Sequence, residues 1–419
     1  MKKTKISLVI ISLLLLCAIA VNMTGCATTV QTVDLMEGIT PREVTALNDL
    51  SGNNADVTDF AIRLFKQTNE NGENTLISPL SVLCALAMTA NGADGETREQ
   101  MEAVLGMSVE KLNLYLYSYM NSLPQSEKYT LSLANSIWFT EDSRFTANRN
   151  FLQTNADYYG ADIYEAPFDK QTLKDINNWV KRETDGMIPK VLEDIPQVAV
   201  MYLINALAFE AEWMEIYEKN QVHDRTFTKE DGIKQDVELM YSTEGKYLEE
   251  EKATGFIKYY KGGKYAFVAL LPNEGVTVAE YIGSLDGASL NALLANAESR
   301  TVETAIPKFE TEYDTEMSEI LQAMGMADAF NVTLADFSNL GESTEENIYI
   351  NSVIHKTYIQ VGEKGTKAGA VTVVEMNDGA AGPPDEVKQV YLDRPFVYML
   401  IDCENNIPFF IGTMMNVNQ

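Results

Sequence analysis

The sequence has few residues suited to nucleophilic or metal chemistry. Its 419 residues include two histidines and four cysteines. A histidine-dependent hydrolase would have to use His223 or His355, and two histidines so far apart in the chain make a poor metal site. The sequence contains no Gly-x-Ser-x-Gly elbow, P-loop, Gly-x-Gly-x-x-Gly or Cys-x-x-Cys motif. Carboxylates are plentiful, but their spacing singles out no catalytic pair. We therefore predict a protein that is not an enzyme and binds no metal or cofactor.

Positive charge is also scarce. The chain has 32 Lys and Arg against 61 Asp and Glu, and a formal net charge of −29. A surface of this sign repels nucleic acid and anionic membranes, so we expect no nucleic-acid partner. Hydrophobic residues make up 46% of the chain, which is enough for one large core. We expect a monomer.

The first residues have the pattern of an export signal. Three lysines among the first five residues precede an apolar run over residues 6–21. The run ends in Met-Thr-Gly-Cys at residues 23–26, which resembles a bacterial lipobox except that Met23 replaces the usual leucine. We predict a signal peptide over 1–25, a lipid anchor on Cys26, and an exported protein that is lipid-anchored at the bacterial cell surface or extracellular. The alternative is a plain secretory signal with a chance cysteine.

The remaining cysteines do not form a disulfide framework. Cys84 and Cys403 lie in apolar runs and are predicted to be small buried hydrophobic residues. Residues 26–55 are rich in Thr, Asp, Asn and Gly, and we predict that they form a tether. A single globular domain is expected over 56–419.

Helical patterns dominate the first half of the domain and strand patterns the second. Apolar residues at helical spacing begin at Val57, and Ser78-Pro79 has the pattern of a helix start. A nearly continuous apolar run over 201–209 predicts a strand buried on both faces, with Asn205 in its middle. The other elements predicted are strands at 131–139, 265–271, 396–401 and 408–412, and a helix at 171–184. This order indicates an α+β fold of one unit.

The segment from Glu363 to Met376 alternates with period two. Every second residue from Thr366 onward is uncharged, whereas Lys367 and Glu375 fall on the other face. The uncharged face consists of Thr366, Ala368, Ala370, Thr372, Val374 and Met376. Residues 377–385 then have turn and loop composition. The alternation alone is also consistent with an ordinary strand followed by a surface loop.

Several motifs, in order, resemble the serpin family over about residues 57–416, essentially the whole predicted domain. They are Ser78-Pro79-x-Ser81, Gly92-Ala93-x-Gly95-x-Thr97, Ile176-Asn177-x-Trp179-Val180, Asn205-Ala206-x-x-Phe209 with Trp213, Ile306-Pro307-Lys308-Phe309, Ala335-Asp336-Phe337-Ser338, His355-Lys356, Glu363-Lys364-Gly365-Thr366-Lys367-Ala368 and Arg394-Pro395-Phe396. The resemblance implies the serpin fold, in which helices pack on a large central mixed β-sheet with two further sheets and an exposed reactive loop.

The resemblance also implies a function. A serpin offers its loop to a protease, is cleaved, and inserts the cut loop into the central sheet with the acylated protease attached. We therefore expect a suicide-type inhibitor of extracellular serine, or alternatively cysteine, endopeptidases. The alternative is a non-inhibitory surface binding or adhesion lipoprotein with a serpin fold. The uncharged face from Thr366 to Met376 favours the inhibitor, because a charge there would be buried on insertion.

Site residues follow from the resemblance. The loop hinge would comprise Glu363, Lys364, Gly365, Thr366, Lys367, Ala368, Gly369 and Ala370. The polar cluster where the sheet opens would be Ser78, Ser81, Asn205 and His355, and Trp213 would stand where the inserting strand enters the sheet. Gly362, Lys364 and Lys367 depart from the residues usual in the family.

The loop is longer than usual in the family, so two counts of the scissile bond differ. Counting from the hinge places it at Gly379–Ala380, with Met376–Asn377 as runner-up. Counting back from Pro395 gives Pro383–Pro384, where proline restricts its neighbour. No Arg or Lys occurs from Ala368 to Val387. The expected targets are elastase-like, subtilisin-like or papain-like proteases rather than trypsin-like ones.

Overall fold

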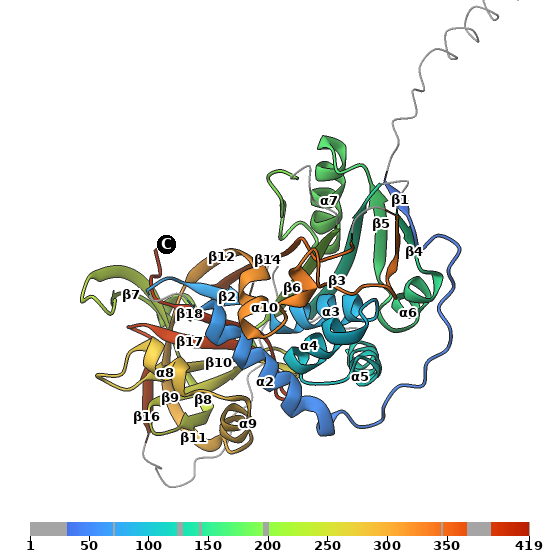
Figure 1. Cartoon of the computed structure of the whole chain (residues 1–419). Helices are drawn as coiled ribbons and strands as arrows, with labels where there is room; N and C mark the ends of the chain where they lie inside the picture. The colour runs from blue at the N-terminus through green and yellow to red at the C-terminus, as the bar shows by residue number, and fades with distance from the viewer. Residues whose placement is uncertain are drawn as a thin grey trace, which may run out of the picture.

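The chain folds into two large β-sheets, a small two-stranded sheet and a set of helices packed around them (Figure 1). The computed structural model describes residues 32–69, 72–123, 129–141, 145–195, 201–344, 347–366 and 387–418. The predicted α+β class and the large central mixed sheet are confirmed.

The first sheet has seven strands, and it carries the elements that matter for function. Its spatial order is β1 (Val33–Asp34), β5 (Asp162–Ala166), β3 (Tyr129–Thr140), β6 (Met201–Glu212), β15 (Gly365–Thr366), β14 (Ser352–Gly362) and β12 (Phe309–Glu316). The sheet is mixed because β6 is antiparallel to β3 but parallel to β14. The long strand predicted around Asn205 is β6, at the centre of this sheet.

The second sheet has nine strands and closes over the core. Its path is β16 (Lys388–Tyr391), β11 (Glu298–Pro307), β8 (Lys234–Glu249), β9 (Ala253–Tyr259), β10 (Tyr265–Pro272), β17 (Phe396–Asp402), β18 (Ile407–Met414) and β2 (Thr75–Ile77), with β7 (Val222–Thr228) paired to β8. Every residue of β10, β17 and β18 is buried, which explains their largely apolar composition. The two-stranded sheet joins β4 (Phe145–Ala147) to β13 (Gly341–Ser343).

The helices pack against both large sheets. They are α2 (Ser51–Thr68), α3 (Pro79–Ala90), α4 (Gly95–Leu105), α5 (Val109–Ser122), α6 (Arg149–Tyr159), α7 (Lys170–Glu183), α8 (Val278–Ser284), α9 (Gly287–Ala295) and α10 (Ser318–Met324), with 3-10 turns η1 (Lys219–Gln221) and η2 (Asp328–Phe330). Every residue of α3 is buried, so this helix is central, as its apolar composition predicts. The Ser78 hydroxyl accepts the Ser81 N–H and caps the helix, with Pro79 in its first turn.

The predicted tether over 26–55 needs correction in its described part. Val33–Asp34 form β1 and pair with β5 at the edge of the seven-stranded sheet. The backbone N–H and the guanidinium of Arg42 both donate to the carboxylate of Asp157, and α2 already begins at Ser51. Polar composition suggested a free spacer because these contacts use backbone pairing and charge rather than a periodic apolar face. The described part of this segment is packed against the domain.

The predicted signal peptide and the lipid-anchor residue Cys26 lie outside the described residues. Among the helices that the structure does describe, none has the length and apolar character required to cross a bilayer. Cys84 is buried and Cys403 half-buried, and neither is in a disulfide. Burial raises the pKa of the Cys84 thiol to about 12, so it stays protonated and inert at neutral pH.

Candidate functional site

The structure describes four of the eight predicted hinge residues, Glu363, Lys364, Gly365 and Thr366. Residues 367–370 lie outside the described residues, as do both candidate scissile bonds, Gly379–Ala380 and Met376–Asn377. The two ends of the undescribed stretch are held by β15 before it and by β16 after it, where β16 pairs in parallel with β11. The chain between these strands is the predicted reactive loop.

Gly365 and Thr366, the two described hinge residues nearest the loop, form the strand β15 between β6 and β14. Gly365 lies opposite Glu212 of β6 and Gly362 of β14, and β15 is antiparallel to both neighbours. A Cβ atom on Gly365 would lie 2.0 Å from the carbonyl oxygen of Ala211, so only glycine fits this close approach. The sheet is therefore wedged open at this end by the start of the loop.

Thr366 follows within β15 and points into the core. Its side chain is buried, and its hydroxyl shares a hydrogen bond with the hydroxyl of Tyr260 at 2.5 Å. Burial raises the pKa of Tyr260 above its ordinary value, so this hydroxyl stays neutral. Thr366 thus occupies the inward position of the two-residue strand β15, between β6 and β14.

Trp213, predicted where the strand enters the sheet, holds the hinge backbone. Its main-chain N–H donates to the carbonyl of Lys364 at 2.8 Å, and its indole N–H donates to the carbonyl of Gly362 at 2.9 Å. Its ring is buried and stacks on Tyr260 with centroids 4.4 Å apart. Since the same tyrosine binds Thr366, the indole and the hinge share one rigid support.

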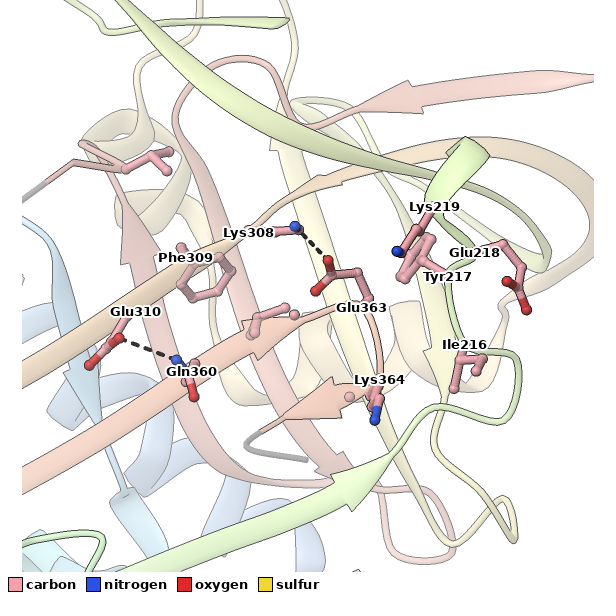
Figure 2. Close-up of a pocket in the computed structure, with 14 residues that line it drawn as sticks. Ile216, Tyr217, Glu218, Lys219, Lys308, Phe309, Glu310, Gln360, Glu363 and Lys364 are labelled. Carbon is pink, nitrogen blue, oxygen red and sulfur yellow. Dashed lines mark hydrogen bonds and ion pairs between the residues drawn. The ribbon is translucent and has the colours of Figure 1, made fainter. Parts of the chain in front are cut away.

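Glu363 forms an ion pair with Lys308 at 2.6 Å, and Lys308 also contacts Glu238 at 3.1 Å. The hydrogen bond from Lys308 holds the pKa of the Glu363 carboxyl below its ordinary value. Partial burial disfavours the charged lysine, but its bonds to both glutamates outweigh this and raise its pKa. Figure 2 shows this pair at the wall of a pocket of about 790 Å³ that the hinge itself lines.

A buried lysine beneath the hinge was missed by the sequence reasoning. The Lys258 ammonium is buried, forms an ion pair with Glu244 at 2.8 Å, and lies over the rings of Tyr217 and Trp213, 4.5 and 5.4 Å from their centroids. The N–H of Tyr217 in turn donates to the carbonyl of Glu363. The available signal was a single charge inside an apolar run, since Lys258 is the only charged residue from 253 to 260.

The predicted sheet-opening cluster lies further along β6. The N–H of Ser78 donates to Nε2 of His355 at 3.0 Å, and Ser78, Ser81 and His355 are all buried. His355 is opposite Asn205 in the β6–β14 register, but the Asn205 side chain lies outside the described part of the structure. Burial lowers the pKa of His355 to about 3, so its ring is neutral, with Nε2 accepting. The role of this cluster stays a prediction.

The hinge and the polar cluster lie beside different parts of β6. Asn205 and Glu212 are seven residues apart in β6, which corresponds to roughly 23 Å. Direct β6–β14 pairing in the described residues runs from Tyr202 to Asn205, and β15 pairs with β6 only at Ala211 and Glu212. The predicted residues thus mark the two ends of the gap in the sheet into which a strand would extend.

Comparison with known proteins identifies the architecture. The family model described as Serpin (serine protease inhibitor) matches residues 55–417. The chain belongs to the serpin family. An uncharacterized serpin-like protein of Thermococcus kodakarensis is 29% identical over 368 residues, which cover 86% of this serpin and 84% of the relative.

Among solved structures, this serpin resembles the thermophilic serpin tengpin. The match to tengpin in its native state has a TM-score of 0.88 at 50% identity, and covers 92% of this chain and 100% of that one. The match to tengpin in its latent state has a TM-score of 0.79 at 47% identity, and covers 89% and 100%. The match to the native-state structure therefore has the higher TM-score of the two.

Proposed function

We propose that this serpin is a suicide-type inhibitor of extracellular serine endopeptidases, with papain-like cysteine endopeptidases as the second target class. The observation that carries the proposal is β15. Its two residues lie between β6 and β14, with Thr366 buried at the first inward position. A loop that begins inside the sheet needs only to continue along the same register to become a full strand.

The register supports this continuation. Gly365 is opposite Glu212, so a strand extended without a bulge would bring Met376 opposite Met201, the first residue of β6. Residues 365–376 and β6 therefore have the same length of twelve residues. Because Thr366 faces the core, the uncharged residues at every second position after it would face the core as well.

The same register gives the polar cluster a role. A strand growing from Thr366 would reach the row of Asn205 and His355, where β6 and β14 are still paired. Insertion must break that pairing, so the Ser78–His355 contact lies where the sheet has to part. We propose that these buried polar groups hold the lower half of the sheet closed until the loop is cut.

The chemistry of trapping follows from the hinge count. The protease nucleophile attacks the carbonyl carbon of Gly379, an acyl bond forms, and the peptide bond to Ala380 breaks. Residues 377–379 would then link the inserted strand to the protease. With no Lys or Arg from Ala368 to Val387, a pocket built for a cation has nothing to bind. Elastase-like, subtilisin-like and papain-like enzymes fit the small and apolar residues near Gly379.

The second candidate function is a non-inhibitory scaffold used for surface binding or adhesion. Its loop would not need to enter the sheet, so bulky or charged residues would be tolerated at the inward positions. The burial of Thr366 and the uncharged residues that follow favour the inhibitor.

We also propose that Cys26 is the acylated first residue of the mature protein, as the Met-Thr-Gly-Cys motif after an apolar run suggests. The intact mass of membrane-extracted protein tests this, and an acylated terminus at Cys26 is the expected result. A mature terminus at any other residue contradicts the anchor but leaves the inhibitor proposal standing.

A protease panel tests the inhibitor proposal. The purified serpin is incubated with elastase, subtilisin, papain and trypsin, and each mixture is analysed by denaturing electrophoresis and mass spectrometry. We expect an SDS-resistant complex with elastase or subtilisin, and release of the fragment beginning at Ala380. Cleavage of the loop by elastase, subtilisin or papain without any loss of their activity would favour the scaffold.

A further inference from the structure

The edge strand β1 lies at the end of the central sheet opposite the hinge. Val33 is paired with Glu165 of β5, which is paired with Phe139 of β3, which is paired with Met201 of β6. The hinge residue of β15 is instead paired with the last residue of β6, eleven positions away or roughly 35 Å along the strand. Figure 1 likewise has β1 and α7 at one end of the molecule and β16, where the reactive loop ends, at the other.

At this pole, only a few residues separate β1 from the predicted lipid-anchor residue Cys26. The hydroxyl of Thr32 donates to the carboxylate of Asp175 in α7 at 2.8 Å, and the N–H of Leu35 donates to the carbonyl of Ile163. Five residues separate Thr32 from Cys26. At a maximum of about 3.5 Å per residue, Cys26 lies no further than about 20 Å from Thr32.

The helix α7 differs in charge from the whole protein. Its residues, Lys170–Glu183, carry four basic side chains against two acidic ones, although the net charge of the chain is −29. The four basic residues are exposed, namely Lys170, Lys174, Lys181 and Arg182, and Arg182 is paired with Glu183. Exposed basic side chains are attracted to an anionic membrane surface. The exposed face of α7, rather than the whole pole, therefore complements such a surface.

We propose that α7 and β1 form the membrane-facing pole of this serpin, with α7 resting on anionic lipid headgroups. The inference rests on the proposed lipid anchor at Cys26, because the short segment between Cys26 and Thr32 would hold this pole close to the membrane surface. Both attachments of the reactive loop then face away from the bilayer. The inhibitor presents its loop to soluble proteases that approach from outside the cell.

Lysine footprinting on anchored protein tests this orientation. The acylated full-length serpin is placed in vesicles of phosphatidylglycerol and phosphatidylcholine, acetylated briefly, and compared by mass spectrometry with detergent-released protein. We expect acetylation of Lys170, Lys174 and Lys181 to fall several-fold on the vesicles. Lys219 and Lys364, exposed near the hinge, should react equally in both samples. Equal acetylation at α7 in both samples, or protection at Lys364, overturns the proposal.

A charge variant separates contact from anchoring. Lys174→Glu with Lys181→Glu changes two exposed side chains, so the variant should fold and inhibit as the wild type does. We expect it to pellet with the vesicles through its lipid while Lys170 loses its protection. Acylated wild-type protein that pellets with the vesicles without protection of α7 refutes the orientation alone. Protein that lacks acylation and stays in solution refutes the anchor and this inference together, whereas the protease panel judges the inhibitor separately.

Discussion

Thr366 is the residue on which loop insertion depends, because it is buried before any residue that follows it. Thr366 is already buried within β15 in the uncut protein, so Arg at this position would leave the sheet, because an unpaired charge beside Tyr260 costs several kcal/mol. Insertion would then have to bury that charge. Each ~1.4 kcal/mol added to the insertion barrier slows insertion about tenfold relative to deacylation. We expect Thr366→Arg to turn the inhibitor into a substrate, measured as moles of serpin consumed per mole of protease inactivated.

Two substitutions serve as controls for this measurement. Thr366→Ser keeps the hydroxyl that bonds Tyr260, and Lys364→Arg changes an exposed side chain without changing its charge. Both should inhibit with a stoichiometry close to that of the wild type. If Thr366→Arg inhibits as efficiently as Lys364→Arg, insertion does not begin at Thr366.

Lys258 is the buried charge that supports Trp213 and Tyr217 beneath the hinge. Removing one partner of a buried ion pair leaves the other uncompensated, which costs about 3–5 kcal/mol. We expect Lys258→Met to destabilise the native state by this amount in urea unfolding, and to shift the fluorescence of Trp213 because its cationic neighbour is lost.

Variants of Glu244, the partner of Lys258, and of the nearby Lys261 serve as controls for this stability measurement. The double variant Lys258→Met with Glu244→Met should recover most of the lost stability, since neither charge is then left unpaired. Lys261→Met breaks a partly exposed pair with Glu212 and should cost less than about 1 kcal/mol. Equal losses for Lys258→Met and Lys261→Met would contradict the role assigned to burial.

His355 makes stability depend on pH. Its pKa is about 3 in the folded protein against an ordinary value of 6.5, so between these values the unfolded chain binds a proton that the folded protein excludes. Stability from the neutral ring is therefore complete above pH 6.5 and is lost as pH falls toward 3. Linkage predicts a loss of about 2 kcal/mol between pH 7 and pH 5.

A variant isolates this effect from the titration of carboxylates. His355→Gln removes the titrating ring but keeps an acceptor for the N–H of Ser78. Urea unfolding at pH 7 and pH 5 should show a smaller loss for the variant than for the wild type. The same pH dependence in both proteins would mean that His355 is not the group that titrates.

At the scale of elements, the sequence was sufficient to predict the long helices and strands with strong apolar patterns, but not the shortest strands. The apolar run of α3 and the strand around Asn205 could be predicted because burial on every side leaves a clear compositional mark. The two-residue strands β1 and β15 have too few side chains for any period. β15 also pairs with the adjacent β14, but the pairing of β1 with β5 and of β15 with β6 joins strands more than a hundred residues apart, which local propensity does not encode.

The N-terminal segment gives a test at this scale. Arg42 is largely exposed but holds the buried carboxylate of Asp157, whose pKa is lowered because hydrogen bonds from Arg42 outweigh its burial. We expect Arg42→Ala to loosen residues 32–50 while α3 keeps its protection. Hydrogen exchange measures both. Unchanged exchange in residues 32–50 would mean that the β1–β5 pairing holds the segment without this ion pair.

At the scale of the molecule, the ordered motifs predicted the architecture and several site positions, but not how the parts meet. Trp213 and Thr366 could be placed at the hinge from their order in the chain. The contacts of Lys258 and Tyr260 with them could not, because Lys258 lies in β9 of the other large sheet and Tyr260 directly follows that strand. The net charge of the chain also did not predict the charge of individual elements, since α7 is basic although the protein is acidic.

The central claim is that the uncut protein stores the free energy of a missing strand in its sheet. Insertion of residues 367–376 would add five inward side chains and extend two ladders of hydrogen bonds, worth on the order of 10 kcal/mol. The direct measurement is thermal unfolding of the intact protein and of protein nicked near Gly379. We expect the nicked protein to melt higher by roughly 10 °C or more. Equal melting temperatures, with the nick verified by mass, would contradict it.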